Sequence, residues 1–276
     1  MIYQPNFKKA DVFSEDIEYK LRYYSLFLNP DDERIETSHL HDCYEIYLNI
    51  SGDVKFLINN HVYSVEHGDI VLTHPNDMHV CILNSPSLHE HFCLYFNCSA
   101  DSPLVKFFNN LSFVPLLSFD KDTKKKLIES FHSMKNADES GQSLAFAAHF
   151  FSFFSMLNEN KERDIVNTVP TVKLPDELQK ILDYINNNYI DIKYIDNIVS
   201  DTYVSATTLN RWFKKYIRLT PRKYLEMKKL AYAKILLDEG KSVTDACMES
   251  GFSDCSHFIS VFKKKFGKTP NKYKKE

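Results

Sequence analysis

The chain has 276 residues, a hydrophobic content of 43%, a charged content of 26% and a formal net charge of −3. This length accommodates two ordinary domains, and this composition excludes wholesale disorder. The longest apolar stretch, residues 144–157, is interrupted by a histidine and two serines and is too short to span a bilayer. The N-terminal sequence lacks the basic and apolar run of a signal peptide, and the six cysteines form no C-x-x-C pair. We therefore expect a soluble cytoplasmic protein with reduced thiols.

The charge is divided unevenly along the chain. Residues 173–276 carry 20 Lys and Arg against 13 Asp and Glu, whereas residues 1–172 carry 14 against 24. A basic C-terminal half joined to an acidic N-terminal half suggests that only the former meets a polyanion. The alternative is that the positive excess serves solubility on an otherwise inert surface.

The first 120 residues are typical of a sheet protein. Short apolar runs with turn signals between them, such as Ser51-Gly52-Asp53, recur about every 8–10 residues. The runs are residues 46–50, 54–58, 62–65 and 70–72. This spacing predicts an antiparallel sandwich or barrel.

The apolar period then changes to a helical one over residues 121–160. The second helix of this segment, residues 141–160, carries apolar residues on more than one face, namely Phe146, Phe150, Phe151, Phe153, Phe154, Met156 and Leu157. We interpret it as a dimerisation helix; the alternative is a deeply buried bundle helix. Residues 161–174 are polar with one internal proline and predict a linker.

Residues 175–276 predict helices, with an internal repeat at an offset of 49 residues. Seven of the twelve residues from Phe213 to Tyr224 are identical to those from Phe262 to Tyr273. Two copies of one helical unit follow from this repeat. In each copy, a tight turn precedes an amphipathic helix that ends in a basic cluster, as in a helix-turn-helix whose second helix enters the major groove. A plain helical bundle with a solvated lysine face is the alternative.

The second copy contains Gly251-Phe252-Ser253-Asp254, Phe258, Phe262-Lys263, Gly267 and Thr269-Pro270. These residues resemble the signature of the bacterial AraC/XylS family of transcription regulators, and the resemblance extends over about residues 178–275. It implies two helix-turn-helix units, joined by a long helix, that bind successive major-groove faces of double-stranded promoter or operator DNA. The base-reading residues that it implies are Thr207, Asn210, Arg211, Cys255, Ser256 and Ser260. The phosphate contacts that we expect at the ends of the two helices are Lys214, Lys215, Lys263 and Lys264.

The chain departs from that family at several positions. Arg218 stands where the family usually has glycine, and Lys229 where it usually has arginine. Ala246-Cys247 replaces the more typical Ile-Ala pair. The second reading face has no Arg, Asn or Gln, so we expect it to contact mainly the DNA backbone and shape.

The N-terminal half contains His39-x-His41-x-x-x-Glu45 and, further on, Gly68-Asp69 and His79, which resemble the two cupin motifs. Two histidines at i and i+2 on one strand point to the same side, and Glu45 shares that side. The weak metal candidate is therefore His39, His41, Glu45 and His79, the ligand set of metal-dependent cupin enzymes; our expectation is no bound metal and no cofactor. The expected effector site comprises Arg22, His41, Glu45, Tyr47, His79 and Tyr95, with Phe56 more typical of barrel core.

The predicted fold is α+β and multidomain, with a cupin-like antiparallel β-barrel at 1–120, helices at 121–160, a linker at 161–174 and an all-α double helix-turn-helix at 175–276. The predicted function is a sequence-specific DNA-binding transcription regulator, not an enzyme, whose barrel binds a sugar or related metabolite and which forms a homodimer. RNA polymerase is a further partner that the resemblance implies. The alternatives are a metal-dependent cupin enzyme fused to a DNA-binding module, and an architectural DNA binder without an effector.

Overall fold

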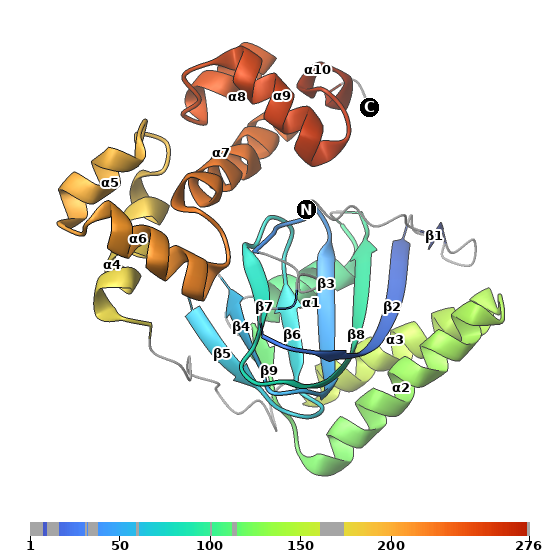
Figure 1. Ribbon diagram of the computed structural model, residues 1–276. Coiled ribbons are helices and arrows are strands. Elements are labelled where there is room, and N and C mark those ends of the chain that lie inside the picture. Colours follow the sequence, from blue (N-terminus) through green and yellow to red (C-terminus); the bar gives the residue numbers. More distant parts are fainter. Residues whose placement is uncertain are drawn as a thin grey trace. The chain divides into compact units, whose positions relative to one another are not determined.

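The computed structural model of the chain describes residues 8–9, 17–30, 32, 38–58, 61–99, 101–111, 115–160 and 174–274. These residues divide into two compact units (Figure 1). The helical unit comprises residues 174–274 with the short segment 38–40, and the sheet unit comprises the other described residues from 8 to 160. Of the predicted linker, only residue 174 lies within the described part of the chain.

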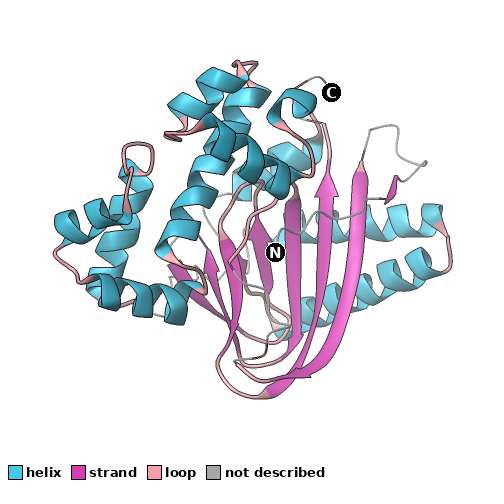
Figure 2. Ribbon diagram, turned by 45° about the horizontal axis from the view of Figure 1, so that its top comes forward, coloured by secondary structure: helices cyan, strands magenta, loops and turns pink. Residues whose placement is uncertain are grey.

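The sheet unit is built from antiparallel strands in two sheets (Figure 2). The strands are β1 (Lys8–Lys9), β2 (Glu18–Leu28), β3 (Tyr44–Ser51), β4 (Val54–Ile58), β5 (His61–Val65), β6 (Ile70–Thr73), β7 (His79–Leu83), β8 (Ser87–Asn97) and β9 (Leu116–Leu117). One sheet has the order β1-β2-β8-β3-β6-β9, and the other has the order β5-β4-β7. Tyr47 of the first sheet contacts Phe56 of the second, with 4.5 Å between ring centroids. In the described residues the two sheets do not close into one barrel, which corrects that detail of the prediction, although the arrangement is compatible with a jelly roll.

One face of the six-stranded sheet carries the main apolar core and is covered by helices. These helices are α1 (Pro103–Leu111), α2 (Lys121–Glu139) and α3 (Ser143–Asn160). Alternate residues of β3 and β8, such as Ile46, Leu48 and Phe92, join this core and are fully buried. Tyr19 of β2 stacks on Phe146 of α3 at 3.9 Å between ring centroids. Because successive side chains of a strand point to opposite faces, these apolar residues form one face of the sheet, and the residues between them form the opposite face.

The phenylalanines of α3 are mostly core residues of their own unit. Phe146, Phe150 and Phe153 are fully buried, and Phe154 and Leu157 are nearly so. Leu144 and Phe151 remain 71% and 46% exposed. The buried-helix alternative therefore accounts for most of the apolar residues, and only the exposed pair is left for a contact with a second chain.

The helical unit contains the elements that the periodicity predicts after residue 175. They are α4 (Asp176–Asn188), α5 (Ile195–Thr202), α6 (Ala206–Trp212), the π-helix η1 (Phe213–Ile217), α7 (Pro221–Asp238), α8 (Val243–Glu249), α9 (Cys255–Phe266) and α10 (Pro270–Tyr273). In the part of the chain that the structure describes, no helix has both the length and the apolar character needed to cross a membrane.

The internal repeat of the sequence is also a repeat of contacts. Phe213 packs edge-to-face on Tyr224 with ring centroids 5.5 Å apart, and the equivalent Phe262 packs on Tyr273 at 5.6 Å. Both phenylalanines are fully buried. Equal residues at equal positions therefore form the same helix–turn–helix contact twice, which confirms the two copies predicted from the 49-residue offset.

Candidate functional site

The face of the six-stranded sheet opposite the helices gathers most of the predicted effector residues. In the strand register, Arg22 of β2 and Tyr47 of β3 both pair with Cys93 of β8, and Glu45 pairs with Tyr95. Directly paired residues of neighbouring strands share one face of a sheet. The sequence analysis predicted that Arg22, Glu45, Tyr47 and Tyr95 belong to one site. The strand register places them in two adjacent rows on one face of the sheet.

The same face holds polar residues that the sequence reasoning missed. Tyr47 Oη lies 2.8 Å from His89 Nε2 and 3.1 Å from Asn49 Oδ1, and the ring of His89 stacks on that of His91 at 4.3 Å. Burial lowers the pKa of His89 to about 4 and that of His91 to about 3, so both imidazoles are neutral at pH 7. The sequence could have predicted these residues, because polar side chains alternate with Phe92, Leu94 and Phe96 within residues 89–96 and therefore lie on the opposite face of the strand.

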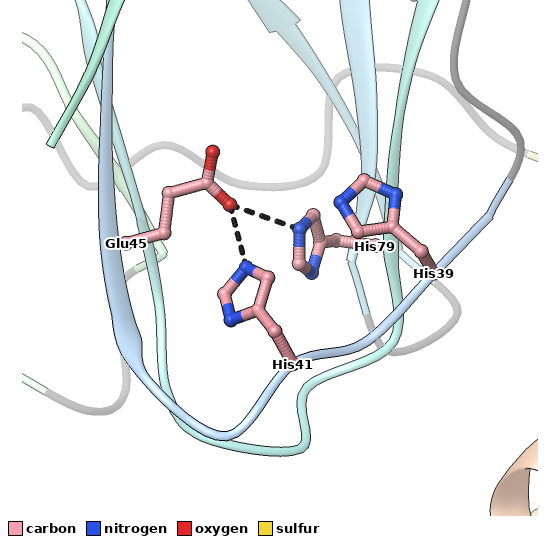
Figure 3. Close-up of side chains that lie close together, drawn as sticks. All are labelled: His39, His41, Glu45 and His79. Carbon is pink, nitrogen blue, oxygen red and sulfur yellow. Dashed lines mark hydrogen bonds and ion pairs between the residues drawn. The ribbon is translucent and has the colours of Figure 1, made fainter. Parts of the chain in front are cut away.

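A carboxylate shared by two imidazoles lies at one end of this face (Figure 3). Glu45 Oε2 is 2.9 Å from His41 Nε2 and 3.0 Å from His79 Nε2. His39, the fourth predicted residue, belongs to the helical unit, whereas His41, Glu45 and His79 all belong to the sheet unit. All four side chains are buried. These are the four residues that the cupin-like motifs singled out.

The electrostatics of this cluster favour opposite charges on its members. Burial alone would raise the pKa of Glu45, but hydrogen bonds and charge from His41 and His79 outweigh it and hold the pKa well below the usual range. Burial alone would lower the pKa of His79, but the bond to Glu45 outweighs it and raises the pKa. The cluster therefore holds a negative carboxylate among imidazoles, an arrangement suited to a proton or a metal cation.

The backbone places these residues differently from the prediction. His41 does not lie on a strand, because β3 begins only at Tyr44 and residues 42–43 form a bend. The expectation that strand alternation aligns His39 with His41 is therefore wrong. Instead, the bend turns the chain so that the His41 ring reaches back to Glu45, four residues later.

In the helical unit, the first predicted recognition helix exposes the expected side chains. Ser205 accepts a hydrogen bond from the backbone N–H of Thr208 and starts α6, as its position before the apolar pattern predicts. Leu209 is fully buried, whereas Thr207, Asn210 and Arg211 are exposed. Asn210 donates to the carbonyl oxygen of Ala206 at 2.9 Å, so a base contact requires its other amide hydrogen or its oxygen. Lys214 and Lys215 are exposed on η1, directly after this helix.

The second predicted recognition helix, α9, is anchored by Phe258 and Phe262, both fully buried. Ser256 and Ser260 are exposed, as are Lys263 and Lys264 near the end of the helix. Cys255 is half-buried and packs against the apolar core of the helical unit. Its position leaves Ser256 and Ser260 as the more accessible of the three proposed readers on α9.

A buried lysine connects the two helix-turn-helix copies, a role that the sequence did not indicate. Lys229 of α7 donates to the carbonyl oxygens of Ile192 at 2.7 Å and Gly251 at 2.6 Å. Gly251 has φ 83°, and a Cβ atom there would lie 2.1 Å from the carbonyl oxygen of Ile190. Only glycine fits at this close approach. A cavity of about 370 Å³ lies beside this contact and is lined in part by Arg222, Glu226 and His257.

Comparison with known proteins gives matches to both units. Residues 25–154 match a family model described as AraC-like ligand binding domain, and residues 198–276 match one described as helix-turn-helix domain. The HTH-type transcriptional activator RhaS of Enterobacter sp. (strain 638) is 23% identical over 248 residues, which cover 84% of this chain and 85% of that protein. The uncharacterized HTH-type transcriptional regulator YbfI of Bacillus subtilis (strain 168) is 25% identical over 222 residues, 80% of each chain. Among solved structures, ToxT from Vibrio cholerae O395 is 17% identical, with 93% of this chain and 96% of that chain covered and a TM-score of 0.37.

Proposed function

Because the chain belongs to the AraC family of DNA-binding transcription regulators, with an N-terminal ligand-binding domain, we propose that a small polar metabolite controls its binding to promoter DNA. We further propose that the protein acts in the cytoplasm as a homodimer, contacts RNA polymerase when bound, and catalyses no reaction. The observation that carries the proposal is the repeated helix–turn–helix contact, Phe213 on Tyr224 and Phe262 on Tyr273, which presents two helices with exposed polar residues and terminal lysines.

The proposed division of the DNA contacts follows from side-chain chemistry. Asn210 and Arg211 carry planar groups that can form paired hydrogen bonds with base edges, and they are exposed on α6. The short hydroxyls of Ser256 and Ser260 on α9 make weaker base contacts. The exposed lysines after each helix attract phosphates without reading the sequence. The first copy would therefore supply most of the specificity and the second mainly affinity.

The proposed effector site is the polar face of the six-stranded sheet. Tyr47 and Tyr95 supply aromatic surface and hydroxyl groups, and Arg22 supplies a cation whose Nη1 donates to Tyr24 at 2.6 Å. A small metabolite with several hydroxyl groups, such as a sugar, has apolar C–H faces for the rings and donors and acceptors for the polar groups. Tyr47 and Tyr95 are buried and Arg22 is half-buried, which supports a ligand that is largely enclosed.

The proposed homodimer contact is the exposed pair Leu144 and Phe151 on α3. The two residues are seven apart and therefore lie on one side of the helix. An exposed leucine and phenylalanine on the same side of a helix gain free energy when a second copy covers them.

The test is a fluorescence anisotropy titration of the full-length protein on its own promoter DNA and on a scrambled duplex. Tighter binding to the promoter, altered by a sugar or another polar metabolite, supports the proposal. Equal affinity for both duplexes at several salt concentrations contradicts it.

A further inference from the structure

Residues 174–274 contain two cysteines, one on each helix of the second helix-turn-helix copy. Cys247 belongs to α8, and Cys255 is the first residue of α9, the second predicted recognition helix. Cys247 is fully buried in the apolar core of this copy, and Cys255 packs against that core while remaining partly exposed. Both are free thiols. One buried and one accessible thiol therefore share the contact between the two helices.

A tight turn brings the two thiols together. Gly251 has φ 83°, and the backbone N–H of Phe252 donates to the carbonyl oxygen of Cys247 at 3.1 Å, so the chain reverses direction directly after α8. The Cys247 thiol points towards this turn, with its Sγ 4.0 Å from the carbonyl oxygen of Phe252. The ring of Phe252 packs on that of Phe258 at 5.2 Å between centroids, which fixes α9 against the turn. The thiols of Cys247 and Cys255 consequently form a hydrogen bond with each other.

The two thiols differ in their reactivity. Burial, together with the hydrogen bond to Cys255, raises the pKa of Cys247 to about 12, so this thiol stays protonated at neutral pH and is inert towards oxidants in solution. A small oxidant reaches the partly exposed Cys255 first. An accessible cysteine beside a second thiol that can form a disulfide with it is the usual arrangement of a redox-sensing pair.

We infer that Cys247 and Cys255 are an oxidation site for hydrogen peroxide, and that their disulfide weakens promoter binding. The Cys255 sulfur attacks one peroxide oxygen, the O–O bond breaks, and a sulfenic acid forms while the thiol proton leaves with the other oxygen as water. The Cys247 sulfur then attacks the sulfenic sulfur, the S–O bond breaks, and the Cys247 proton leaves with the hydroxyl group as a second water. Two thiols are thus oxidised to one disulfide, and one peroxide is reduced to water.

The disulfide changes the position of the recognition helix. Its two sulfurs are about 2 Å apart, closer than any non-bonded contact, so the start of α9 has to move towards α8. Asp254 caps α9 by accepting from the backbone N–H of Ser256 at 2.8 Å, and this cap moves with the helix. Ser256 is one of the proposed base contacts, and base edges are recognised only at hydrogen-bond distance. The effect on DNA rests on the proposed function, because it requires α9 to lie in the major groove.

The experiment treats the reduced full-length protein with a molar excess of hydrogen peroxide, alkylates the remaining thiols and digests the protein with trypsin. Both cysteines lie in one tryptic peptide, residues 242–263, because no Lys or Arg lies between Lys241 and Lys263. A disulfide leaves this peptide unalkylated and lighter than the dithiol form by two hydrogen atoms. Anisotropy titrations on promoter DNA accompany each sample. We expect the oxidised protein to bind at least about 10-fold more weakly, and dithiothreitol to restore its affinity.

Cys247→Ala is the decisive variant. Alanine is the residue more typical of the family at this position, so we expect the reduced variant to fold and to bind promoter DNA like the unsubstituted protein. Without the second thiol no disulfide forms in the peptide, and the promoter affinity should no longer respond to peroxide. Cys98→Ser, at a partly buried cysteine of the sheet unit, is the matched control and should keep the response.

Three outcomes would overturn the inference. They are the absence of a disulfide in the peptide after peroxide treatment, a disulfide with unchanged promoter affinity, and an equal loss of affinity in Cys247→Ala. If that variant does not fold, the first two measurements on the unsubstituted protein decide. A reduced protein that binds no promoter DNA contradicts the proposed function instead, and the mass of the peptide still tests the oxidation site.

Discussion

Arg218 and Gly267 occupy the same position of the internal repeat, 49 residues apart, and both have a left-handed backbone. Their φ angles are 57° and 75°. Gly267 ends α9, and Arg218 ends the π-helix that continues α6. The turn after each recognition helix therefore needs the same conformation, which glycine adopts freely and arginine only at a cost.

The substitution Arg218→Gly is expected to stabilise the helical unit. Relief of the left-handed strain outweighs the greater freedom of glycine in the unfolded chain, and the gain is about 0.5–1 kcal/mol. Urea unfolding followed by circular dichroism measures the change. The reciprocal control, Gly267→Ala, is expected to destabilise by about 1 kcal/mol. A loss of stability in Arg218→Gly would show that the arginine side chain contributes more than its backbone costs.

The buried ammonium of Lys229 is expected to determine the geometry of the two recognition helices. Lys229→Met leaves the carbonyl oxygens of Ile192 and Gly251 without this donor and should destabilise the protein by about 1–3 kcal/mol. This contact connects the two copies, so we expect its loss to make their spacing less fixed. Insertion of 1 bp between the two DNA segments that the copies bind should therefore reduce the promoter affinity of the variant less than that of the unsubstituted protein. Lys180→Met, at an exposed lysine of α4, is the control. Equal sensitivity to the insertion in all three proteins would restrict Lys229 to a role in stability.

The division of DNA contacts predicts different effects for two substitutions. Arg211→Ala is expected to cost about 1–3 kcal/mol on the promoter and to relax the preference at one base position. Lys263→Ala is expected to weaken binding to promoter and scrambled DNA alike and to lower the salt slope by about one. Salt titrations of each variant on both duplexes measure these effects. An equal loss on both duplexes for Arg211→Ala would identify that residue as a phosphate contact.

The buried His89 predicts a loss of stability on acidification. Its pKa is lowered to about 4 by burial, so between about pH 6.5 and 4 the unfolded chain binds a proton that the folded chain does not. The stability that depends on the neutral imidazole is complete above about pH 6.5 and decreases as the pH falls towards 4. From pH 7 to pH 5 the loss through this group is about 2 kcal/mol, and His89→Gln should remove that part of the pH dependence. Urea unfolding at both pH values measures this loss, and His67→Gln, at an exposed histidine, is the control. If His89→Gln shows the same pH dependence of stability as the unsubstituted protein, His89 is not its source.

The exposed apolar pair of α3 predicts the oligomeric state. Phe151→Lys places a charge on the proposed contact and is expected to shift the full-length protein from dimer to monomer at tens of micromolar, on the order of the Kd of a weak dimer. Sedimentation equilibrium is the measurement. Leu88→Lys, at another exposed apolar residue of the sheet unit, is the control and should not alter the mass. A monomeric unsubstituted protein at that concentration would exclude this dimer.

The sequence by itself determined the elements whose formation depends on local interactions. The turn at Ser51-Gly52-Asp53 and the cap at Ser205 lie where the residue types predicted them, because turns and caps are formed by side chains close in the chain. The repeated Phe213–Tyr224 contact was also foreseeable, since two similar sequences fold alike. The motifs predicted that His41, Glu45 and His79 lie together, but they did not predict that a bend rather than a strand brings His41 to Glu45.

Only the tertiary structure decided which faces of the helices and strands were buried and which distant groups met. The apolar residues of α3 have a similar pattern in a dimer helix and in a core helix, and packing against the sheet buried Phe146, Phe150 and Phe153. The lowered pKa of His89 depends on a strand register that joins β8 to β3, which no local signal specifies. Lys229 belongs to a helix whose sequence gives no reason to bury a charge, and two carbonyl oxygens from distant turns stabilise it there. Such contacts join residues far apart in the chain, and their free energy exists only after the chain has folded around them.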